Sequence, residues 1–92
     1  MDRKTLEYME GRAAKAREIV KKIDELSRAA EQIVGANYVQ FEDHYGNIRA
    51  TLRGYRNGNS MQQPRVVNSI CKSVVEVIRL EIQQLEQELA EL

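Results

Sequence analysis

Cysteine and histidine are almost absent from this chain, and their scarcity excludes two kinds of site. Cys71 is the single cysteine, so no disulfide can form within one chain. A lone thiol inside an apolar helical pattern suits core packing and a reducing cytosol. His44 is the single histidine, and without a second histidine or cysteine the usual zinc ligands cannot be assembled. We therefore expect no metal site, and His44 is expected to be a polar turn residue.

Long apolar runs and phosphate-binding motifs are also missing. No apolar stretch reaches the roughly 18 residues that would predict a membrane-spanning helix. Residues 1–8 are charged and mixed, so no signal peptide is expected. Neither GxxxxGK[ST] nor GxGxxG occurs, and no set of nucleophile and base is placed by any pattern. We expect a cytoplasmic protein that has no membrane contact, is not an enzyme and needs no cofactor.

Acidic residues are absent from a third of the chain. Between Asp43 and Glu76 there are none, although the whole protein balances 14 basic against 14 acidic side chains. The basic residues of this acid-free window are Arg49, Arg53, Arg56, Arg65 and Lys72. A local positive field in a neutral protein marks a place where an anion can dock.

Two segments show the apolar spacing of amphipathic helices. The first covers about residues 3–34, with Asp2 as its cap and Gly35 at its end. Its stripe is Met9, Ala13, Ala16, Val20, Ile23, Ala30 and Val34, widened by Ile19, Leu26 and Ile33. The second covers about residues 62–92 and starts either at a Ser60 cap or at Pro64. Its seam is Cys71, Val74, Ile78, Ile82, Leu85, Leu89 and Leu92. The two lengths match, so the helices are expected to pair antiparallel.

Residues 37–53 alternate between apolar and polar side chains on both sides of a turn at 44–47, which predicts a β-hairpin. Pairing Glu42 with Arg49 places Phe41 opposite Ala50 and aligns Val39 with Leu52 on one apolar face. The chain is thus expected to be one domain, 1–92, of the α+β class and mainly α. Two long antiparallel helices are joined by the hairpin and by a basic loop, residues 53–63.

A monomer of this design would leave apolar surface uncovered. A two-stranded hairpin alone is marginally stable in water. Two helices also cannot cover Val75, Val77 and Leu80 together. We therefore expect a homo-oligomer, and most soluble homo-oligomers are closed and symmetric.

The predicted ligand site combines the hairpin's polar face with the basic loop. Arginine offers a planar fork suited to phosphate, tyrosine can stack on a base, and a helix N-terminus favours an anion. The candidate residues are Arg49, Arg53, Tyr55, Arg56, Asn57 and Arg65, with Tyr38 as a stacking residue. In an alternative interpretation, the loop is a solvated connector whose arginines pair with acids of a neighbouring subunit.

The chain resembles accessory proteins of phages and prophages of Gram-positive bacteria in three stretches. These are residues 1–10 (MDRKTLEYME), 16–23 (AREIVKKI) and 84–89 (QLEQEL). Such proteins include the anti-Thoeris and anti-CBASS sponges, small homo-oligomers that capture nucleotide second messengers of anti-phage immunity. The resemblance implies binding without turnover. In topology, two helices joined by a hairpin also resemble a prefoldin subunit, although these helices are shorter and the Arg/Gly/Asn loop is foreign to that family.

Three functions remain open at this point. The first is an oligomeric sponge that sequesters a small anionic, nucleotide-type ligand. The second is a coiled-coil or hairpin module for protein–protein interaction or assembly. The third is a nucleic-acid-binding accessory protein, which the net charge of zero and the pI of about 6.6 disfavour.

Overall fold

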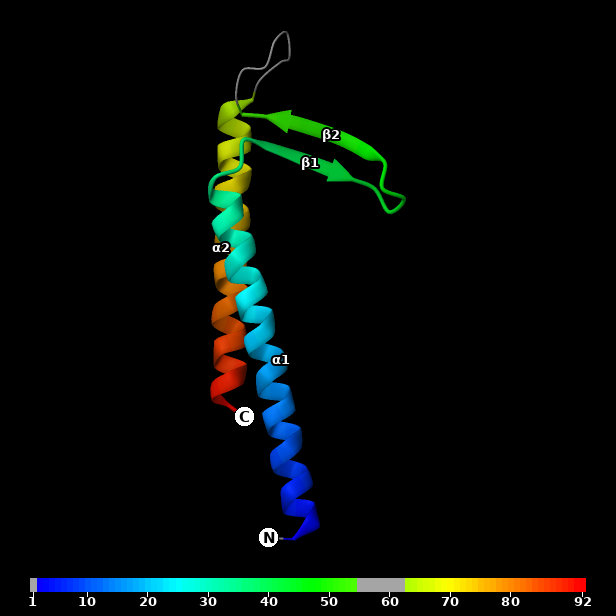
Figure 1. Cartoon of the computed structure of the whole chain (residues 1–92). Helices are drawn as coiled ribbons and strands as arrows, with labels where there is room; N and C mark the ends of the chain where they lie inside the picture. Colours follow the sequence, from blue (N-terminus) through cyan, green and yellow to red (C-terminus); the bar gives the residue numbers. More distant parts are fainter. Residues whose placement is uncertain (1, 55–62) are drawn as a thin grey trace.

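A computed structural model describes residues 2–54 and 63–92 of the chain. It contains helix α1 (Arg3–Val34), strands β1 (Tyr38–Glu42) and β2 (Ile48–Arg53), and helix α2 (Pro64–Ala90) (Figure 1). The fold is α+β and mainly α, as the sequence predicts. The two helices lie side by side in opposite directions, and the molecule is 70 Å along its longest axis. Neither described helix carries an apolar segment long enough to cross a membrane.

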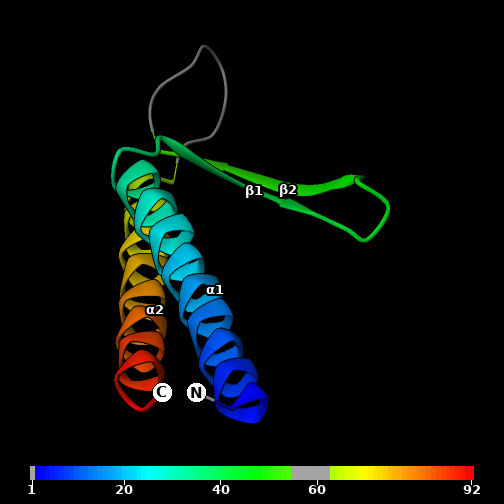
Figure 2. The same ribbon diagram turned by 60° about the horizontal axis from the view of Figure 1, so that its bottom comes forward.

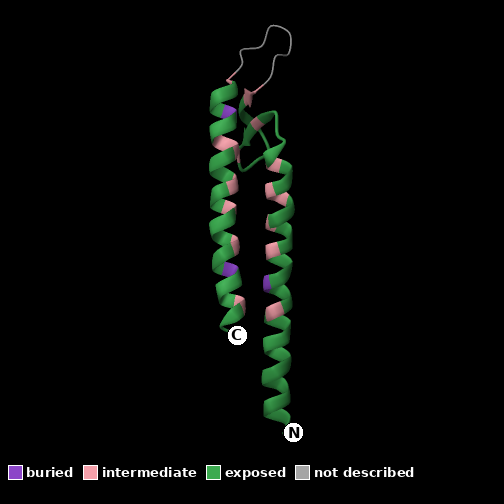
Figure 3. Cartoon of the chain, turned by 90° about the vertical axis from the view of Figure 1, so that its left-hand side faces the viewer, coloured by how far each residue is buried: buried purple, intermediate pink, exposed green. Residues whose placement is uncertain are grey.

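The hairpin leaves the helix pair at the end where α1 stops and α2 starts. Figures 1 and 2 show it extending sideways from that end, and the view along it in Figure 3 confirms that it leaves the plane of the two helices. The molecule therefore has the shape of an L, with the helix pair as the long arm. Most of the hairpin lacks a helix beneath it.

Both helices begin and end where local chemistry predicts. The carboxylate of Asp2 accepts a hydrogen bond of 2.8 Å from the N–H of Thr5, and this bond lowers the pKa of Asp2. Gly35 follows the last residue of α1. Helix α2 has Pro64 as its first residue, where a missing N–H costs nothing. Of the two predicted starts this is the correct one; Ser60 lies outside the described residues.

The core is a thin seam between the helices. Among the described residues, the buried side chains are Ile19 of α1 with Leu85 and Val67 of α2, and Val67 also packs against Gly54 at the base of the hairpin (Figure 3). The predicted stripe of α1 is confirmed in part. Three members of its main row and the three residues that widen it are buried or half-buried: Ala16, Ile23, Ala30, Ile19, Leu26 and Ile33. Met9, Val20 and Val34 of the predicted row are exposed, so the seam is centred closer to Ile19 than predicted.

The hairpin confirms most of the predicted register and corrects one pair. Val39 lies opposite Leu52 and Phe41 opposite Ala50, as expected. Glu42, however, is opposite Ile48 and not Arg49, because the ladder is irregular between Phe41 and Glu42. The irregularity leaves Arg49 as an extra residue on β2, as in a β-bulge.

Candidate functional site

The base of the hairpin brings two of the predicted site residues together. Tyr38 and Arg53 are cross-strand partners, and the guanidinium carbon of Arg53 lies 5.8 Å from the centre of the Tyr38 ring. That distance allows a cation–π interaction. Tyr38 is 49% exposed and Arg53 is half-buried, so the pair is accessible from solvent.

Backbone hydrogen bonds hold this pair beside the start of α2. The N–H of Gly54 donates to the carbonyl of Asn37 at 2.6 Å, and the N–H of Gln63 donates to the carbonyl of Arg53 at 2.7 Å. Glycine suits this position because an added Cβ would lie 3.0 Å from that Asn37 oxygen, a tight contact that the backbone would have to relieve. The last residue of β2 is therefore fixed against the residue that precedes α2.

Positive charge gathers at this end of the molecule. Arg65 is exposed in the first turn of α2, and that turn contains no acidic residue. Gln63, the N-cap, makes no side-chain capping bond, so the partial positive charge of the helix end is not offset there. Among the described residues, neither Arg53 nor Arg65 forms an ion pair. Arg53, Arg65 and the helix end could thus attract a small anion.

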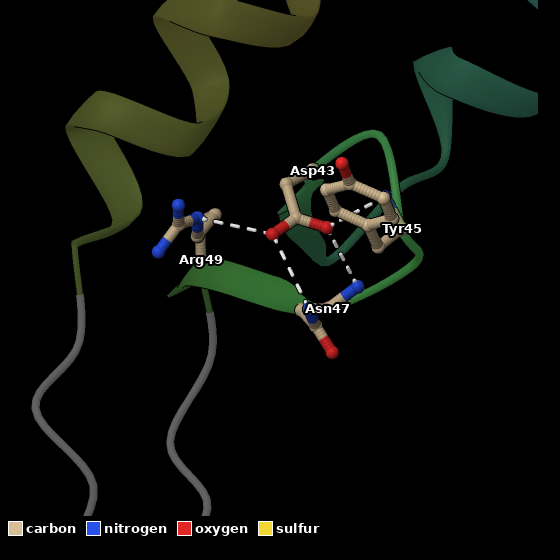
Figure 4. A network of polar contacts seen from close by, with 4 residues as sticks. All are labelled: Asp43, Tyr45, Asn47 and Arg49. Atoms are coloured by element: carbon tan, nitrogen blue, oxygen red, sulfur yellow. Dashed lines mark hydrogen bonds and ion pairs between the residues drawn. The ribbon is translucent and has the colours of Figure 1, made fainter.

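Arg49 belongs to a different place, at the far end of the hairpin. It is four residues from Arg53 along β2, about 13 Å at the rise of a strand. Its Nε lies 3.4 Å from Oδ2 of Asp43 (Figure 4). The sequence had instead predicted Glu42 as the partner of Arg49. The bulge and the turn bring Asp43, rather than Glu42, to the guanidinium. Arg49 is therefore neutralised by its own hairpin.

Asp43 organises the turn, a role that sequence reasoning missed. Its Oδ1 accepts hydrogen bonds from the N–H groups of Tyr45 (2.9 Å) and Asn47 (3.0 Å) (Figure 4). The bond from the Asn47 backbone is the main cause that lowers the pKa of Asp43. Gly46 completes the turn with a φ of 81°, a value that favours glycine. An aspartate three residues before a Gly-Asn pair is the sequence signal that could have identified this turn.

The remaining predicted site residues, Tyr55, Arg56 and Asn57, lie outside the described part of the chain. A groove of about 390 Å³ runs along the helix pair near the hairpin end, between Val34 and a face of α2 that includes Cys71 and Lys72. Of the predicted site residues that the structure describes, none lines it. Cys71 is half-buried there and forms no disulfide. In residues 2–54 and 63–92, no three His, Cys, Asp or Glu side chains gather as a metal ion would require.

Comparison with known proteins gives no assignment. No protein-family model, no curated protein and no solved structure matches this chain.

Proposed function

We propose that this chain is a homo-oligomeric assembly module in which the hairpin joins one copy to another. The observation that carries this proposal is the exposure of large apolar side chains on a hairpin that stands away from the helices. Phe41 is 49% exposed and Ile48 is 59% exposed, although both are large apolar side chains on strands. Within the described part of the chain, both edges of the two-stranded sheet also lack a further strand.

The free energy of burial favours covering Phe41. The exposed half of a phenylalanine is on the order of 100 Å², and its burial stabilises a contact by about 2.5 kcal/mol at 25 cal/mol per Å². The contact would be made twice in a symmetric pair. Pairing the strand edges would convert two marginal hairpins into a sheet of at least four strands, which is stable where two strands are not.

The test is the mass in solution of Phe41→Lys, measured by size-exclusion chromatography with light scattering. A charge at this position disfavours burial, so the variant is expected to form smaller particles than the native chain at the same concentration. Gln40→Lys is the matched control, since it places the same charge on the neighbouring, polar face of the same strand. A native chain that is monomeric at high micromolar concentration, or equal masses for all three proteins, would contradict the proposal.

A second candidate function is capture of a small anionic, nucleotide-type ligand, as in a phage anti-defence sponge acting in the host cytosol. The Tyr38–Arg53 pair beside Arg65 and the start of α2 favours it. Arginine supplies the fork for a phosphate, and the exposed tyrosine ring supplies a face for a base. Assembly through the hairpins would multiply such sites within one particle.

Thermal-shift measurements with cyclic and linear nucleotides test this second function. A ligand at 100 times its dissociation constant stabilises the native state by about 2.7 kcal/mol, which should raise the melting temperature of a small domain by several degrees. Arg53→Ala is expected to remove the shift, whereas Arg49→Ala should keep it because Arg49 already pairs with Asp43. If no nucleotide shifts the native melting temperature, the sponge function is wrong.

A further inference from the structure

Helix α2 carries a second apolar stripe that the helix pair does not cover. We define the outer stripe as Val66, Ile70, Val77 and Leu80. Val66, Val77 and Leu80 are 41%, 65% and 56% exposed, and Ile70 is half-buried. Their spacing of four, seven and three residues keeps them on one side of the helix. The buried residues Val67 and Leu85 lie on another side of the helix, where Val67 packs against Gly54 at the base of the hairpin. The first half of α2 is thus apolar on two faces.

We infer that the outer stripe packs against the same stripe of a second copy, with the two α2 helices antiparallel and a two-fold axis near Ser73. The inference rests on the proposed homo-oligomer and gives it a contact separate from the hairpin. The occupant is a second copy because both the apolar pattern and the charge pattern of α2 complement themselves in this arrangement.

The apolar pattern fits because a two-fold antiparallel contact pairs residues whose numbers add to a constant. With Ser73 at the axis, Val66 lies opposite Leu80 of the partner subunit. Ile70 then lies opposite Val77 of the partner subunit, within one residue of the same sum. The small side chain of Ser73 faces its own copy, where the helices approach most closely. The apolar overlap from Val66 to Leu80 is about 21 Å at the rise of a helix.

The charges of α2 fit the same direction. Its first half carries Arg65, Lys72 and Arg79 with a single acid, Glu76, whereas every charged residue from 81 to 91 is a glutamate. Antiparallel packing brings Lys72 within two residue positions, about 3 Å along the helix axis, of Glu76 of the partner subunit at the register set by the apolar residues. A parallel pair would place like charges side by side. Glu76 already lies 3.4 Å from Arg79 of its own helix, but such an exposed pair is weak and can exchange partners.

Disulfide trapping tests the axis directly. In a Cys71→Ser background, Ser73→Cys places the single thiol of each copy at the two-fold axis. A disulfide needs Cα atoms about 4.4–6.8 Å apart, which an antiparallel pair crossing at this residue provides. Mild oxidation is expected to give a covalent dimer on a non-reducing gel. The matched control, Asn68→Cys in the same background, has an exposed thiol on another face of α2 and should stay monomeric on the gel.

Charge exchange tests the direction of packing. Lys72→Glu places a glutamate near Glu76 of the partner subunit and should lower the yield of trapped dimer by roughly 1.4-fold to 5-fold for each pair, the range for exposed ion pairs. Adding Glu76→Lys should restore trapping. Far-UV circular dichroism of each variant shows that the helices are retained.

The result separates this inference from the hairpin contact. Trapping at position 73 that persists in a Phe41→Lys chain supports the outer stripe even if the hairpin contact is wrong. A native-sized oligomer whose Ser73→Cys variant is trapped no more than Asn68→Cys overturns the outer stripe and leaves the hairpin proposal standing.

Discussion

Leu85→Ala tests the interhelical seam against the outer stripe within one helix. Leu85 is 6% exposed, and its replacement by alanine removes about three carbon groups from the seam. At about 0.8 kcal/mol per buried CH₂ this loses roughly 2.4 kcal/mol, and an incompletely collapsed cavity raises the cost to about 3 kcal/mol. A domain of this size has a free energy of unfolding of about 5–14 kcal/mol, so the loss is a large share of it.

Leu80→Ala is the matched control, because it makes the same substitution in the same helix at a side chain that is 56% exposed. Any change in helix propensity is therefore common to both variants. In the monomer, Leu80→Ala should lower the free energy of unfolding by about 0.5 kcal/mol or less, as surface substitutions usually do.

Urea unfolding followed by far-UV circular dichroism gives both values, at a protein concentration low enough to dissociate any oligomer. Equal losses for the two variants in the monomer would refute the packing of α2 on α1 described above. At higher concentration, the outer-stripe contact predicts that only the cost of Leu80→Ala grows.

Three further predictions concern the hairpin and its joint with the helices. The turn hydrogen bonds, chiefly the Asn47 backbone N–H, depress the pKa of Asp43 below its ordinary 3.8, so their stabilisation is complete above that pH and is lost as pH falls through the folded pKa. Amide NMR signals of the turn should therefore shift in acid, and Asp43→Asn should abolish that transition; an unchanged titration would contradict this role. Gly46→Ala should destabilise the hairpin by about 1 kcal/mol because φ is 81°, and Gly46→Asn should cost less, as hydrogen exchange of the strand amides would report. Gly54→Val should lower the melting temperature, since its Cβ would meet a backbone oxygen at 3.0 Å, whereas Gly35→Ala, with nothing within 4 Å, should not.

The elements of the fold follow from the sequence because their signals are local. Asp2 and Gly35 bound α1, and the alternation around residues 44–47 gives the hairpin with Phe41 opposite Ala50. Which members of the wide apolar stripe of α1 become buried was not predictable in the same way. Val20 and Ile19 are both apolar, and only the packing of two whole helices buries Ile19 and leaves Val20 exposed.

The candidate site was predicted only in part, for a related reason. Tyr38 and Arg53 meet because they are cross-strand partners, which alternation alone can specify. Arg49 was assigned to the same face, yet a bulge of one residue sends it to Asp43. A bulge changes register without changing composition, so counting alternate positions cannot detect it. Homo-oligomerisation and ligand capture stay predictions.

The position of the hairpin between the helices also sets the order in which the chain is expected to fold. The contact of Gly54 with Asn37 closes a loop of seventeen positions, whereas the hydrogen bond from Arg12 to the Leu92 carbonyl joins residues 80 positions apart. Closing the longer loop first would cost about 1.4 kcal/mol more in chain entropy. Hairpins form within microseconds, so we expect the contacts between the helices to form first at the hairpin end and then progressively toward the two chain ends. On this view the far end of the helix pair is the last part to close and the first to fray.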